Sequence, residues 1–109
     1  MNIISGHRDN NFKEHMKSWS RFFIVKNKDS IVIEVSDNYP IKFGYSNPTH
    51  FIGKTDYSMR CPAVRLAPIF IAQDKEIRQT GISRNYVAIT AYYDSGIEAC
   101  FYSKEIKED

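Results

Sequence analysis

The stretch FIGKTDYSM at residues 51–59, followed by AQDKEIRQTG at residues 72–81, decides the fold of this chain. Gly53 predicts a bend in the first stretch, because glycine adopts backbone conformations that other residues avoid. Thr55 or Asp56 is then placed to cap a short helix that follows the bend. The first stretch therefore predicts a turn into helical structure.

The second stretch lies in the longest predicted helix, which runs from about Pro62 to Thr80. Pro68 conflicts with a helix interior, so the helix starts just before Pro68 or kinks there. Gly81 is placed to end it. Residues at spacings of three and four form one face of this helix, namely Leu66, Ile69, Phe70, Gln73 and Ile77.

Two predicted β-hairpins flank this region. The runs 22–25 and 31–35 are rich in β-branched and aromatic residues and enclose four turn-forming residues. The runs 85–93 and 97–106 form the second hairpin around a tight turn at 94–96. Between the first hairpin and the bend, residues 36–38 can cap a short helical segment that ends near Gly44.

The N-terminal residues are predicted to lie outside this core. Residues 1–11 indicate a flexible lead, and residues 11–21 an amphipathic helix with an apolar stripe of Phe12, Met16 and Trp19. So short a helix must pack on something to persist. Its partner could be the chain's own sheet or a second copy, so the stripe is the candidate dimer helix.

The order of elements and the two quoted stretches resemble the PAS family, and more narrowly bacterial sensory PAS domains with an IGKTDYD-P segment followed by F-AQD--V--TG. The resemblance covers about residues 21–106. It implies an α+β fold with a five-stranded antiparallel sheet, helices on one face, and often a ligand cavity between them. We therefore expect a lead and helix over residues 1–20 and a PAS-like sensory domain over 21–109.

The chain departs from the family pattern after residues 97–106, where the family continues with a fifth strand that is central in the sheet. No such C-terminal strand is evident here. An unpaired strand edge invites association, so we expect an intermolecular contact at that edge.

The candidate ligand pocket uses residues expected to point between helix and sheet, which are Phe51, Tyr57, Leu66, Phe70, Ile89, Ala91 and Phe101. A ligand cavity is mostly apolar with a few placed polar groups. The same residues would equally form an ordinary core. The hydroxyls of Tyr57, Tyr86 and Tyr92 could enter a cavity, or lie between core and solvent.

We expect neither haem nor flavin. Haem-binding relatives carry a histidine on the long helix, and residues 62–80 contain none. Flavin-binding relatives carry an Asn-Cys-Arg-Phe-Leu-Gln segment, which Met59-Arg60-Cys61-Pro62 does not match. Cys61 and Cys100 are far apart in the sequence, and we interpret them as packed thiols rather than as a disulfide or a metal site.

Composition excludes several function classes. The net charge of +2 comes from mixed signs, so we expect no direct nucleic-acid contact by this chain. No apolar run approaches the roughly 20 residues that span a bilayer, and the first 11 residues do not resemble a signal peptide, so we expect a cytoplasmic protein.

Gly53-Lys54-Thr55 lacks the upstream glycine of a phosphate-binding loop. No catalytic arrangement is evident, and Asp56 and Asp74 are read as capping and helix-surface residues.

Two functions remain. In the first, the chain is the sensory domain of a bacterial signalling protein, such as a two-component sensor kinase or a transcriptional regulator. It binds a small ligand in a core cavity and transmits through a dimer interface. In the second, it is a ligand-free module for dimerisation or protein interaction. A cavity of about 300 Å³ or more would favour the first function.

Overall fold

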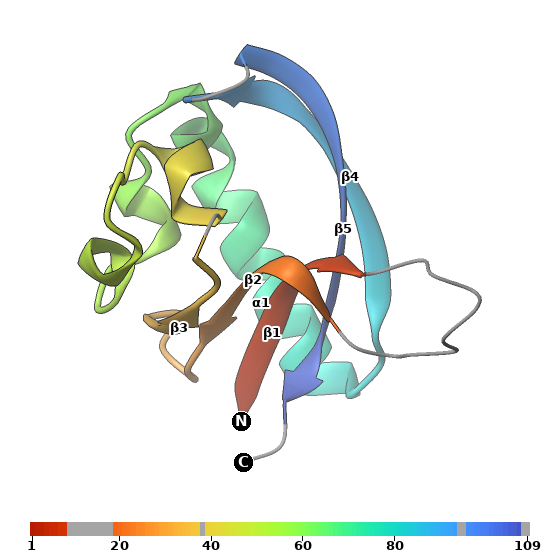
Figure 1. Ribbon diagram of the computed structural model, residues 1–109. Coiled ribbons are helices and arrows are strands. Elements are labelled where there is room, and N and C mark those ends of the chain that lie inside the picture. Colours follow the sequence, from red (N-terminus) through yellow and green to blue (C-terminus); the bar gives the residue numbers. More distant parts are fainter. Residues whose placement is uncertain (9–18, 38, 94–95, 108–109) are drawn as a thin grey trace, which may run out of the picture.

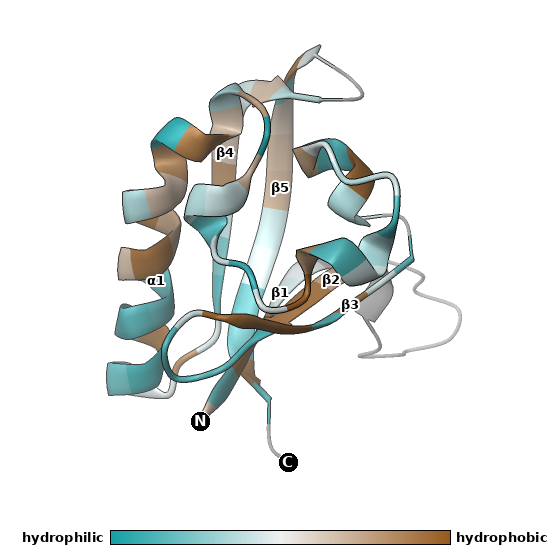
Figure 2. Cartoon of the chain, turned by 90° about the vertical axis from the view of Figure 1, so that its left-hand side faces the viewer, coloured by the Kyte–Doolittle hydropathy of each residue, from teal (hydrophilic) through white to brown (hydrophobic). Residues whose placement is uncertain are grey.

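The computed structural model describes residues 1–8, 19–37, 39–93 and 96–107. Its centre is an antiparallel sheet in the order β3-β2-β1-β5-β4. Helical elements pack against one face of this curved sheet, and α1 runs beside β5 (Figures 1 and 2). The five strands are β1 (Asn2–Arg8), β2 (Trp19–Lys26), β3 (Val32–Val35), β4 (Arg84–Tyr92) and β5 (Gly96–Lys107).

The helical layer consists of four short 3₁₀ segments and one α-helix. The segments are η1 (Tyr39–Phe43), η2 (Pro48–Phe51), η3 (Asp56–Ser58) and η4 (Pro62–Leu66), and the helix is α1 (Ala67–Thr80). These elements confirm the predicted α+β architecture. No helix in the described part of the chain is both long and apolar enough to cross a membrane.

The central strand comes from the N-terminus. β1 pairs with β2 through Ile4↔Val25 and with β5 through Ile4↔Glu105. The predicted flexible lead is therefore wrong for Asn2–Arg8. β1 takes the central position that the resemblance assigns to a C-terminal strand. Because β1 covers the edge of β5, the expected intermolecular contact at that edge is also wrong.

The local signals around the quoted stretches are confirmed. Gly53 has a positive φ of 84°, and Thr55 Oγ1 accepts a hydrogen bond from the Tyr57 N–H. The α-helix starts just before Pro68, which occupies the first turn, where its missing N–H costs nothing. Gly81 ends α1 with a φ of 69°.

The predicted amphipathic helix does not extend as far as expected, because Trp19 begins β2. Phe12 and Met16 lie outside the described residues. Both hairpins are confirmed, with β2 paired to β3 and β4 paired to β5.

Candidate ligand cavity between sheet and helices

A cavity of about 30 Å³ lies between the sheet and the helical layer. It has room for about two water molecules. Its lining is mostly aromatic and apolar, with charged groups at one end. The lining residues are Ser5, Ile24, Lys26, Tyr39, Phe43, Asp56, Met59, Phe70, Tyr92, Cys100, Tyr102 and Lys104.

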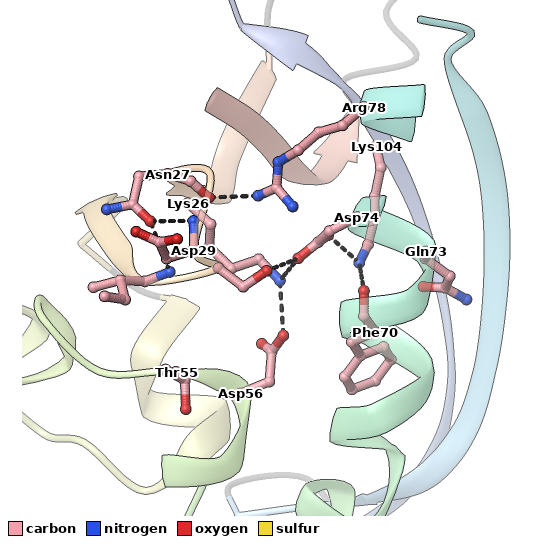
Figure 3. Close-up of polar contacts among 12 residues, drawn as sticks. Lys26, Asn27, Asp29, Thr55, Asp56, Phe70, Gln73, Asp74, Arg78 and Lys104 are labelled. Atoms are coloured by element: carbon pink, nitrogen blue, oxygen red, sulfur yellow. Dashed lines mark hydrogen bonds and ion pairs between the residues drawn. The ribbon is translucent and has the colours of Figure 1, made fainter. Parts of the chain in front are cut away.

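Four buried ionised side chains form a network at the charged end (Figure 3). Lys26 Nζ donates to Asp56 Oδ2 at 2.7 Å and lies 2.6 Å from Asp74 Oδ2. Lys104 Nζ donates to Asp74 Oδ1 at 2.7 Å and to the Phe70 carbonyl at 2.8 Å. None of these four side chains is more than 6% exposed. We call Lys26, Asp56, Asp74 and Lys104 the buried tetrad.

The tetrad brings together distant parts of the chain. Lys26 ends β2, Lys104 lies on β5, Asp56 begins η3, and Asp74 lies on the inner side of α1. Asp74 therefore bridges the two lysines from the helix side. The network joins the sheet to the helical layer through groups that are paired rather than isolated, as buried charges require.

Each charge alters the pKa of its neighbours. Burial by itself lowers the pKa of Lys26, but the carboxylates of Asp56 and Asp74 outweigh it and raise that pKa overall. Burial by itself raises the pKa of Asp74, but Lys26 and Lys104 outweigh it, so the carboxyl stays ionised. Burial and the charge of Lys26 lower the pKa of Lys104 to about 8, against the opposing effect of Asp74.

Aromatic side chains form the walls of the cavity. Phe70 meets Tyr102 edge to face, with ring centroids 5.9 Å apart, and the Tyr102 hydroxyl donates to Gln73 Oε1 at 2.8 Å. Burial raises the pKa of Tyr102 to about 12. Burial also raises the pKa of the Cys100 thiol, which faces the cavity. These groups stay neutral near neutral pH, so the tetrad carries the charge of the site.

The seven predicted pocket residues have different positions. Phe70 lines the cavity. Phe51 is fully buried in the adjoining core, and Leu66 packs against that core. Tyr57 is 60% exposed, so its side chain does not enter the interior.

The remaining three predicted residues lie on the opposite face of the sheet. Ile89 and Phe101 are each 73% exposed, and Ala91 has the same strand parity as Ile89. The inward residues of β4 and β5 have even numbers, including Tyr92, Cys100 and Tyr102. The predictions assigned odd-numbered residues of these strands to the inner face. They failed because a shift of one residue along a strand moves every side chain to the other face.

The sequence reading also missed the two buried lysines and misplaced the two aspartates. Asp74 is fully buried rather than on the helix surface, and Asp56 pairs with Lys26. The alternation of side chains along a strand could have located both lysines. Lys26 lies two residues after the inward Ile24, and Lys104 lies two residues after the inward Tyr102. Of the three tyrosines considered, Tyr92 lines the cavity, while Tyr86 stacks on Tyr102 and its buried hydroxyl has no partner among the described residues.

Among the described residues, no three His, Cys, Asp or Glu side chains are grouped so that they could hold a metal ion. Cys61 and Cys100, the two cysteines of the chain, are not joined in a disulfide.

Comparisons with known proteins support the fold. No family model and no curated protein matches the chain. A solved structure of VqmA from Vibrio cholera, in complex with a ligand and DNA, matches with a TM-score of 0.74 and 27% identity. The match covers 77% of this chain and 37% of that one, so this chain corresponds to a part of the larger protein. The chain therefore has a PAS-like α+β fold, as the sequence predicted.

Proposed function

We propose that this chain is the sensory domain of a bacterial signalling protein and binds a small, weakly polar ligand in the cavity. The observation that carries the proposal is the buried tetrad, of which Lys26, Asp56 and Lys104 line a cavity whose other walls are mostly aromatic and apolar. Ligand sites commonly have this composition, with mostly apolar walls and a few polar groups that orient the ligand.

The tetrad leaves hydrogen-bonding capacity beside the cavity. An ammonium group has three donors. Lys26 directs two of them to Asp56 and Asp74, and Lys104 directs two to Asp74 and the Phe70 carbonyl. One donor on each lysine thus lacks a hydrogen-bond partner in the described part of the chain. A ligand acceptor would supply that partner.

A ligand larger than water requires the cavity walls to move, because about 30 Å³ is far below the roughly 300 Å³ of a usual ligand pocket. The helical layer suits such movement. Tyr39 and Phe43 lie in η1, and Met59 follows η3. Short 3₁₀ segments have weaker hydrogen bonding than an α-helix, and elements that admit ligands are drawn from the less stable parts of a fold.

The proposed output is regulation of an attached effector, in a transcriptional regulator or a sensor kinase. The structural neighbour VqmA was solved with a ligand and DNA, and this chain spans 37% of it. In our proposal the chain is cytoplasmic, forms a homodimer, has no catalytic activity or resident cofactor, and leaves DNA contact to other parts of the protein. A ligand shifts such a domain only by its differential affinity for two conformations.

Native mass spectrometry of the purified chain tests the proposal, since it detects a co-purified small molecule and reports the oligomeric state. Cys100→Leu is the matched variant, because the larger side chain would fill the cavity from an inward position. We expect a bound molecule on the wild type and none on Cys100→Leu. Ligand-observed NMR with phenol, benzamide and benzoate supplies defined probes, and the absence of any binding to the wild type in both measurements contradicts the proposal.

The small cavity favours a second candidate, a ligand-free module for dimerisation or protein interaction. A filled interior needs no ligand to be stable. In that case the wild type and Cys100→Leu would each give the mass of the bare chain without an adduct, and neither would change the probe spectra.

A further inference from the structure

The short helix η1 closes the cavity from the side of the helical layer. Two of its side chains, Tyr39 and Phe43, line the cavity, and both are buried. The ring of Phe43 packs on that of Tyr92 in β4, with ring centroids 6.2 Å apart. Displacement of η1 would therefore open the cavity to solvent between this helix and the β4–β5 hairpin.

An ion pair joins η1 to the hairpin beside the cavity. Lys42 Nζ donates to Glu98 Oε1 at 2.6 Å, and both side chains are partly exposed. The Lys42 carbonyl accepts a hydrogen bond at 2.8 Å from the N–H of Tyr93, which directly follows β4. Lys42 thus holds η1 against the hairpin through its side chain and its backbone. We call the Lys42–Glu98 ion pair the latch.

The latch and the buried tetrad lie at opposite ends of the inner face of β5. The inward residues of this strand between them are Cys100 and Tyr102, which line the cavity. Glu98 and Lys104 are six residues apart, which is about 20 Å along an extended strand. The tetrad fixes α1 and η3 to the sheet. Movement at the latch end therefore leaves the buried ion pairs intact.

The chain is anchored on both sides of η1. Before this helix, the Ser36 N–H donates to the Phe23 carbonyl and Ser36 Oγ accepts from the Phe23 N–H, both at 2.9 Å. After it, Gly44 has a φ of 90°, and the Tyr45 hydroxyl donates to the Ser58 carbonyl at 2.7 Å. A 3₁₀ helix has weaker hydrogen bonding than an α-helix. The short helix can therefore move while its flanks stay attached to the fold.

We propose that η1 is the gate of the cavity and that the latch keeps it closed. Opening breaks the ion pair and the hydrogen bond from Tyr93, and it exposes Cys100 to solvent. So few polar contacts can break in a local fluctuation that leaves the rest of the fold intact. The inference rests on the proposed function for its purpose, because a gate serves a cavity that admits a molecule. The opening itself occurs with or without a ligand.

Modification of Cys100 measures the opening. This thiol lines the cavity and is 4% exposed, so iodoacetamide reaches it only when the gate is open. Mass spectrometry of proteolytic fragments gives its rate separately from that of Cys61. Glu98→Gln and Lys42→Met should each raise the Cys100 rate about fivefold, as expected for the loss of a partly exposed ion pair.

The matched control is Glu76→Gln, which removes a partly exposed ion pair with Arg84 between α1 and the start of β4. Arg84 pairs in register with Lys104, so this ion pair lies at the far end of the hairpin from the latch. The variant should leave the Cys100 rate unchanged.

The two latch variants separate opening from a change in the reactivity of the thiol. Burial raises the pKa of Cys100, while the charge of Lys42 lowers this pKa and the charge of Glu98 raises it. If the thiol reacted with the gate closed, Lys42→Met would slow the reaction and Glu98→Gln would speed it. Faster modification in both variants therefore reports opening.

The urea dependence of the Cys100 rate separates local opening from global unfolding. We expect the rate to rise much less steeply with urea than the unfolding equilibrium does, because opening exposes less surface. A dependence as steep as that of unfolding overturns the inference. So do unchanged rates in both latch variants, opposite changes in the two, or an equal rise in Glu76→Gln. The absence of a bound molecule in native mass spectrometry counts against the proposed function and changes none of these rates.

Discussion

The two faces of the β4–β5 hairpin share one backbone and have opposite environments. Tyr92, Cys100 and Tyr102 face the helical layer and are 4–7% exposed. Ile89 and Phe101, on the same strands, are 73% exposed. The inner face carries the cavity wall and the tetrad lysine Lys104, whereas the outer face has no described element packed on it that buries its large side chains. Position on one side of a sheet, rather than residue type, decides what each side chain contributes.

The largest expected effect comes from removing the charge that holds the inner face to α1. Asp74→Asn leaves two buried ammonium groups without their shared carboxylate, which should cost about 3–5 kcal/mol in the free energy of unfolding. Urea denaturation measures it. The control is Glu76→Gln on the same helix, whose pair with Arg84 is nearly half exposed and should contribute at most about 1 kcal/mol. Equal losses in the two variants would show that the tetrad is not a stabilising network.

Substitutions at the adjacent residues Phe101 and Tyr102 allow the outer and inner faces of β5 to be compared directly. Tyr102→Ala removes a buried ring packed on Phe70 and hydrogen-bonded to Gln73, and should cost about 3–5 kcal/mol. Phe101→Ala on the outer face should cost less than about 1 kcal/mol in dilute protein. Thermal and urea unfolding of both variants checks the difference. If Phe101→Ala proved as damaging as Tyr102→Ala in the monomer, the assigned strand parity would be incorrect.

Acid should destabilise the folded state by removing the charge of Asp74, which pairs α1 with the inner face of the sheet. In the folded state the pKa of Asp74 lies below its ordinary value of 3.8. The ionised carboxylate therefore stabilises the folded state at pH values above about 3.8. This contribution is lost as the pH falls through the folded-state pKa. Urea denaturation between neutral pH and pH about 2 should show a smaller loss for Asp74→Asn than for the wild type. Parallel curves would place the acid sensitivity in other carboxyl groups.

The smallest effect concerns the two thiols. Cys100 faces inward at 4% exposure, and burial raises the pKa of its thiol, whereas Cys61 is only partly buried. Iodoacetamide should therefore modify Cys61 faster than Cys100, by on the order of tenfold. Mass spectrometry of time points gives both rates. Urea should remove the difference, and equal rates in the native chain would contradict the inward position of Cys100.

Much of the fold could be predicted because its signals are local. A turn between two β-branched runs, the bend at Gly53, the start of α1 at Pro68 and its end at Gly81 each depend on a few neighbouring residues. The PAS-like resemblance also rests on such contiguous segments. These parts of the prediction agree with the structure.

The parity of β4 could not be predicted, because residues 86–93 are uncharged and mostly apolar on both faces. Alternation identifies the buried face only when the other face is polar. Phe70 lines the cavity, but Ile69, which the helical spacing places on the same face of α1, is 52% exposed. The tetrad was missed because a lysine in a strand is ordinarily exposed to solvent.

The sequence by itself determined the two hairpins, the helical segments between them and the α+β class of this chain. Only the tertiary structure decided that Asn2–Arg8 fills the centre of the sheet, and that residues 30 positions apart, Lys26 with Asp56 and Asp74 with Lys104, become buried ion pairs. The physical reason is that local signals act within a few residues, while strand neighbours and buried charges are chosen by pairings between distant segments. Those pairings become favourable only when the whole sheet and its helical layer assemble together.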